Sequence, residues 1–171
     1  MTSVSLKGPV ILDIPADPPA MFIVRAVVEK ISARIGFGTE ETDKLVLAVD
    51  EACTNVIRHA YKNSSDERIV ITFRVVSGLA LSLENRGATG EGGCDETGKS
   101  RDCFEIAIRD FGSGADPATF QGRDLNEIRP GGLGIHFIKS AADRVEYDTP
   151  PGGGMLLKLM KFMPGEEKAQ N

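Results

Sequence analysis

The chain has 171 residues, of which 41% are hydrophobic and 26% charged, with a net charge of −5. This length suits one domain, since a chain of this size buries roughly 70% of its unfolded surface. The negative charge argues against a nucleic-acid partner. No stretch approaches the roughly 20 apolar residues of a membrane span, and the N-terminus lacks a signal-peptide core. The three cysteines show no metal-ligand spacing. We therefore expect one cytoplasmic domain over residues 1–171, without nucleic-acid or membrane contacts.

The first half of the chain predicts one strand and two helices. Val10–Ile14 is a short apolar run that reads as a strand. Asp17 and the prolines after it open a helix, which Gly36 ends. Lys44–Tyr61 carries an apolar stripe at helical spacing, with Thr39 or Thr42 as its cap. This amphipathic helix is the central element of the prediction.

The second half predicts strands and one more helix. We expect strands over Ile69–Val76, Leu79–Leu83 after a Ser77-Gly78 turn, Phe104–Ile108, Val145–Tyr147 and Met155–Phe162, and a helix after Gly134. Gly87–Asp102 reads as an exposed loop or insertion, and residues 163–171 as a disordered tail. These elements predict an α+β fold. It would be a two-layer α/β sandwich whose mixed, mostly antiparallel sheet is covered on one face by about three helices.

The central helix carries a second, polar face. Glu51, Asn55 and His59 are spaced by four residues and therefore share one side of it. A Glu carboxylate can accept a proton, and the amide oxygen of Asn can ligate a hard cation such as Mg²⁺. On this helix alone, a merely solvated face is the more common explanation.

One glycine motif matches the phosphate-binding P-loop pattern but lacks its context. Gly93–Ser100, which includes Lys99, fits that pattern letter for letter. A P-loop needs a buried strand before it and a helix after it. Here a glycine-rich stretch precedes the motif and an alternating, strand-like stretch follows it. We therefore reject a P-loop at Lys99.

Two further glycine motifs lie next to predicted elements, one directly after a strand and the other directly before a helix. Asp110, Gly112 and Gly114 come directly after the strand Phe104–Ile108, where the aspartate can accept a hydrogen bond from the exocyclic amine of a base. Gly131–Gly134 leads into a helix, which is typical of a phosphate cradle. A simple turn and a flexible loop are the structural alternatives for the two motifs.

Taken in order, these pieces resemble the GHKL ATP-binding superfamily, which includes gyrase-type topoisomerases, histidine kinases and heat-shock chaperones. Within this superfamily the chain looks most like the bacterial anti-sigma-factor serine kinases. The segments that carry this likeness are AVDEACTNVIRHAY, RDFGSG and GGLGIHFIKSAADRVEY. The likeness covers roughly Val10 to Lys161.

The resemblance implies roles for individual residues and ATP with Mg²⁺ as cofactors. Glu51 matches the catalytic base, Asn55 the Mg²⁺ ligand and Asp110 the aspartate that binds the adenine amino group. Gly112 and Gly114 are expected at the adenine. Residues 115–129 would form a lid over the nucleotide, and Arg123 or Arg129 would offset charge during transfer. The expected phosphate contacts are Gly131, Gly132, Leu133 and Gly134. Met155 stands where the family usually has a Thr that supports adenine recognition, and a thioether cannot act in that way.

The resemblance also implies partners. It predicts serine phosphorylation of an anti-sigma antagonist (STAS-type) protein, sequestration of a sigma factor and a possible homodimer. The alternatives are a non-catalytic ATP-binding switch, a P-loop hydrolase that uses Lys99, and a nucleotide-free interaction domain.

Overall fold

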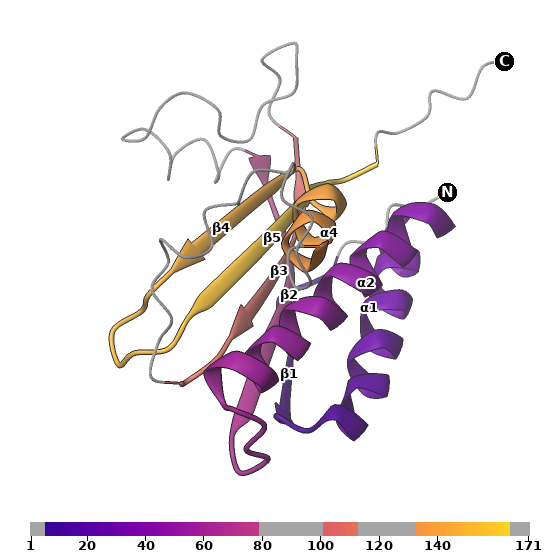
Figure 1. Ribbon diagram of the computed structural model, residues 1–171. Helices are drawn as coiled ribbons and strands as arrows, with labels where there is room; N and C mark the ends of the chain where they lie inside the picture. Colours follow the sequence, from indigo (N-terminus) through magenta and orange to yellow (C-terminus); the bar gives the residue numbers. More distant parts are fainter. Residues whose placement is uncertain (1–5, 79–100, 113–132, 165–171) are drawn as a thin grey trace, which may run out of the picture.

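Five strands form one sheet in the order β1-β2-β3-β5-β4 (Figure 1). The computed structural model describes residues 6–78, 101–112 and 133–164. The strands are β1 Val10–Pro15, β2 Arg68–Val76, β3 Cys103–Arg109, β4 Arg144–Asp148 and β5 Leu156–Phe162. All four neighbouring pairs of these strands are antiparallel. The prediction of a mostly antiparallel sheet is confirmed, and its mixed character is not seen among the described strands.

Three α-helices of the described chain cover one face of this sheet (Figure 1). They are α1 Met21–Ile35, α2 Thr39–Asn55 and α4 Leu133–Ala141, with a short 3₁₀ helix, η1 Pro18–Ala20, before α1. Gly36 ends α1 with a φ of 104°, a left-handed conformation that glycine adopts without steric cost. The two-layer α+β prediction is therefore confirmed.

The helix caps differ in detail from the sequence prediction. Asp17 precedes η1, but its side chain makes no capping hydrogen bond. The N-cap of α2 is Gly38, whose extended backbone at ψ 167° starts the helix, and not a threonine. Glu40 and Glu41 lie in the first turn, where carboxylates suit the positive end of the helix dipole.

The central helix changes its hydrogen-bonding pattern near its end. α2 is followed directly by η2, a π-helix over Val56–Ala60, and Tyr61 ends the segment. π-helical turns are rare and frequently mark functional sites. The sequence predicted one continuous helix over this segment, because the apolar stripe does not distinguish α from π hydrogen bonds.

The core lies between the helices and the sheet. The strands place alternate residues on this side, and the register pairs Ile71 with Ile108 and Phe73 with Ile106. All four side chains are at most 2% exposed. The helices contribute Val24, Val28, Leu45, Val49 and Cys53, each at most 1% exposed. Each such large apolar side chain contributes about 1.5–3 kcal/mol by leaving water.

Several predicted segments fall outside the described residues. They are the returning strand Leu79–Leu83, most of the Gly87–Asp102 loop including the P-loop-like motif, and most of the 163–171 tail. Strand β2 pairs with β1 on one side and with β3 on the other.

Among the helices of the described chain, none has the length and apolarity to cross a membrane.

The buried thiols give a first test of the fold. Burial raises the pKa of Cys53 from 9.0 to about 12 and that of Cys103 to about 11, where the Glu105 charge adds to the effect. Both thiols stay protonated in the folded protein, whereas an unfolded chain releases those protons above pH 9. The free energy of unfolding should therefore fall as the pH rises above about 9.

The measurement is urea unfolding at pH 8 and at pH 10, and thiol labelling of a Cys94→Ser variant, which retains only Cys53 and Cys103, checks the burial itself. At pH 8 we expect slow labelling of the native protein and rapid labelling of both thiols in guanidinium. Fast labelling under native conditions would contradict the burial of these side chains.

Candidate functional site

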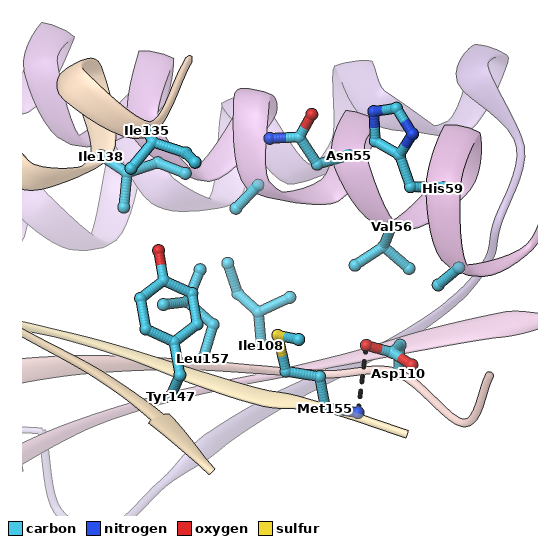
Figure 2. A pocket seen from close by; sticks show the side chains of 12 residues that line it. Asn55, Val56, His59, Ile108, Asp110, Ile135, Ile138, Tyr147, Met155 and Leu157 are labelled. Carbon is cyan, nitrogen blue, oxygen red and sulfur yellow. Dashed lines mark hydrogen bonds between the residues drawn. The ribbon is translucent and has the colours of Figure 1, made fainter. Parts of the chain in front are cut away.

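A cavity of about 260 Å³ lies between the central helix and α4 on one side and the sheet on the other (Figure 2). Its walls are mostly apolar: Ala52, Val56, Ala60, Ile108, Ile135, Ile138, Met155 and Leu157. The polar groups at its edge belong to Asn55, His59, Asp110 and Tyr147. A largely apolar cavity with a few polar groups is typical of a small-molecule site.

Asp110 is the buried charged residue of this cavity, with 4% of its surface exposed. It follows β3 directly, and its backbone N–H donates to the Met155 carbonyl at 3.0 Å. One carboxylate oxygen accepts from the Gly112 N–H at 2.9 Å and the other from the Met155 N–H at 3.2 Å. A carboxylate has about four acceptor sites, so Asp110 retains capacity for a donor in the cavity.

Met155 contributes its backbone to the site. Its side chain is a thioether, which cannot replace a threonine hydroxyl. In the structure its N–H and C=O both bond to Asp110, while its thioether lines the cavity (Figure 2). The support of Asp110 at this position is thus independent of the side chain.

Gly154 and Arg109 bring the turn after β4 against the end of β3. Gly154 has a φ of +70°, and a Cβ there would overlap the backbone carbonyl of Asp110. The Arg109 guanidinium donates to the carbonyl oxygens of Gly153, at 2.5 Å, and of Met155, at 3.3 Å. Sequence reasoning missed Arg109, although a cation one residue before the aspartate was a visible signal.

Tyr61 links the end of the central helix to the segment after Asp110. Its hydroxyl accepts from the Phe111 N–H at 2.7 Å and donates to the Arg68 carbonyl at 2.7 Å. Burial raises the pKa of Tyr61, so the phenol keeps the proton that it donates. The sequence predicted Tyr61 only as the last residue of a helix, and this bridge was missed. Its signal was an aromatic residue with a polar tip at the end of an apolar stripe.

The structure brings some predicted site residues together. Asn55 and Asp110 line the same cavity, joined by His59, for which no role was predicted. Gly112 lies beside them, because a Cβ there would be 3.1 Å from the Ala60 side chain. Glu51 is outside the cavity lining, and its half-buried carboxylate lies against Gly134 in the first turn of α4.

Other predicted residues are not placed. Gly114, Arg129, Gly131 and Gly132 lie outside the described residues, and Leu133 is described only as the first residue of α4. Among the described residues, no group of three or more His, Cys, Asp or Glu side chains could hold a metal ion. Asn55 therefore supplies a single amide oxygen from the cavity wall, and a metal there would need further ligands from a substrate or water.

The Tyr61 bridge can be tested by Tyr61→Phe, which removes only the hydroxyl. Because this leaves the Phe111 N–H without its partner in a part-buried place, we expect a stability loss of about 1–3 kcal/mol. The measurement is urea unfolding of the variant and of the wild-type protein under the same conditions. An equal stability of Tyr61→Phe and wild type would show that the bridge contributes nothing.

Comparison with known proteins gives relatives over most of the chain. Serine-protein kinase RsbW of Bacillus subtilis (strain 168) is 28% identical over 156 residues, which cover 91% of this chain and 86% of the relative. The protein of the same name from Listeria innocua (serovar 6a) is 25% identical over 177 residues and covers 98% and 95%.

Two solved structures share the fold. The RsbU and RsbW domains of Rv1364c from Mycobacterium tuberculosis superpose with a TM-score of 0.54 at 16% identity, over 93% of this chain and 34% of that longer chain. The SiaB–SiaC complex from Pseudomonas aeruginosa gives 0.57 at 9% identity, over 88% of each chain. At such identities the likeness concerns the fold.

A family model adds the decisive match. The model is that of the histidine kinase-like ATPase domain, and it matches residues 14–161. This range runs from the end of β1 into β5 and includes every described residue that lines the cavity. The chain therefore belongs to the histidine kinase-like ATPase domain family.

Proposed function

We propose that this protein is an Mg²⁺-ATP-dependent serine kinase of the anti-sigma regulatory type. The main support is the buried Asp110 carboxylate at the wall of an apolar cavity that is also lined by Asn55, with Glu51 one turn earlier in α2. Four residues of α-helix correspond to about 6 Å of rise, so α2 holds Glu51 and Asn55 on one side at a fixed separation. Relatives that carry the name serine-protein kinase support this assignment.

The residues fit an adenine nucleotide. A flat base suits the space between Val56 and Ala60 of the helix and Ile108 and Leu157 of the sheet. The Asp110 carboxylate offers an acceptor to an exocyclic amine, and its own position is fixed by two backbone N–H donors. Because the walls are apolar, they exclude water that would compete for this hydrogen bond.

Asn55 would hold the Mg²⁺ ion. Mg²⁺ is usually bound through one or two protein oxygens together with phosphates and water, which suits a single amide oxygen at the cavity wall. When bound, the ion offsets the negative charge of the phosphates during transfer. Gly114, Arg129, Gly131, Gly132, Leu133 and Gly134 complete the proposed nucleotide site.

Glu51 acts as the general base. Its carboxylate takes the proton from a serine hydroxyl of the protein substrate as the serine oxygen forms a bond to the γ-phosphorus. The bond between that phosphorus and the bridging oxygen breaks, and ADP leaves. Arg123 or Arg129 offsets the charge that develops.

The proposed partners are proteins. The phosphorylated serine lies on a small STAS-type antagonist, and the kinase sequesters a sigma factor when that antagonist is absent or modified. This partner assignment rests on the resemblance to anti-sigma kinases and on the named relatives. A homodimer is proposed on the same resemblance.

Asp110→Asn tests the nucleotide site. The amide can turn a donor toward the base amine, and a lost charge-assisted hydrogen bond is worth about 1.5–3 kcal/mol. We expect the dissociation constant for ATP to rise roughly ten- to a hundredfold by calorimetry. Lys99→Ala is the matched control and should leave ATP binding nearly unchanged. If the control loses more than about tenfold in affinity, the P-loop alternative returns.

Glu51→Gln separates the kinase from a non-catalytic ATP switch. The amide keeps size and helix propensity but cannot accept the proton. We expect near-normal ATP and partner binding, with phosphate transfer slowed by at least about 10²-fold. The measurement is transfer of labelled γ-phosphate to the antagonist. Transfer at the wild-type rate would remove Glu51 as the base, and a wild type that binds ATP without transfer would establish the switch.

A further inference from the structure

Gly134 is in unusually close contact with Glu51. It is the second residue of α4, it is buried, and its φ lies outside the left-handed range. An added Cβ would overlap the Glu51 side chain, and the three nearest atoms are its Oε1, Cδ and Cγ. The backbone at this position would accept alanine, so the obstacle to a side chain here is Glu51.

The Glu51 carboxylate lies against the first turn of α4 at Gly134. Within the described residues, no hydrogen bond or ion pair fixes its oxygens. Its neighbour Asp50, by contrast, forms an ion pair with Arg25 of α1 at 2.6 Å. The first turn of a helix has free N–H groups and the positive end of the dipole, which favour a nearby carboxylate. Shape and helix polarity together define where Glu51 lies.

We propose that Gly134 is a positioning residue whose missing side chain lets the Glu51 carboxylate lie on the first turn of α4. This inference rests on the proposed function, because it concerns the placement of the base. It gives Gly134 a second role beside the predicted phosphate contact: packing of α4 against α2 sets the direction from which Glu51 meets the serine hydroxyl. A displacement of about 1 Å at such a group can cost about 10²-fold in rate.

The kinetic test is Gly134→Ala in the full chain. Because a flexible Glu side chain moves more easily than backbone, the methyl group should displace the carboxylate and leave the cavity intact. We expect kcat for phosphate transfer to fall about 10²-fold, with a much smaller change of the ATP dissociation constant by calorimetry, because alanine keeps the backbone N–H that is proposed to meet the phosphates. Gly38→Ala is the matched control, since a Cβ there meets nothing within 4 Å, and it should change neither quantity.

A thermal-unfolding cycle without nucleotide tests the contact apart from activity. Alanine is the better helix former, so Gly134→Ala should raise Tm in a Glu51→Ala background, where the obstacle is gone. In the wild-type background the same change should raise Tm less or lower it. Equal shifts of Tm in the two backgrounds would overturn the proposed contact.

The outcomes distinguish this inference from the kinase assignment. If wild type transfers phosphate and Gly134→Ala transfers equally fast, the positioning role is overturned while the kinase stands. If Gly134→Ala instead weakens ATP binding as much as it slows transfer, Gly134 acts through the nucleotide and the positioning role is again overturned. A wild type without transfer overturns the kinase, and the Tm cycle then still decides whether Gly134 orients Glu51.

Discussion

The site depends on the two backbone hydrogen bonds that fix the Asp110 carboxylate. A buried carboxylate without partners would be costly, and the N–H groups of Gly112 and Met155 remove that cost. These donors come from distant parts of the chain, one from the segment after β3 and one from the residue before β5. The acceptor that faces the cavity is therefore fixed by the pairing of β3 with β5.

The surrounding contacts maintain that pairing where the two strands end. Arg109 fastens the turn before β5, and Gly154 lets that turn approach the Asp110 backbone. Tyr61 ties the Asp110 segment to the end of the central helix. The helix that carries Asn55 and the strand that leads to Asp110 are thus connected at one end of the cavity. A ligand that contacts both residues meets a preorganised site, which lowers the entropic cost of binding.

The sequence predicted the fold well because the periodicities are clear. The alternation in β2, β3 and β5 and the apolar stripe of α2 are local signals, and the structure confirms them. Asn55 and Asp110 were predicted as site residues, and both line the same cavity. Contacts between distant segments were missed, such as Tyr61 with Phe111 and Gly134 with Glu51. They depend on how α2, β3 and α4 pack, which a local pattern does not encode.

Backbone groups and side chains have different tasks at this site. Asp110 is oriented by main-chain N–H groups, which every residue except proline supplies. Met155 can therefore replace a threonine without loss of these bonds. The fixed position of Asp110 depends on the strand register and on the glycine at 154, where a Cβ has no room. The chain topology thus provides most of the contacts of the site, and a few side chains, Glu51, Asn55 and Asp110, provide the proposed chemistry.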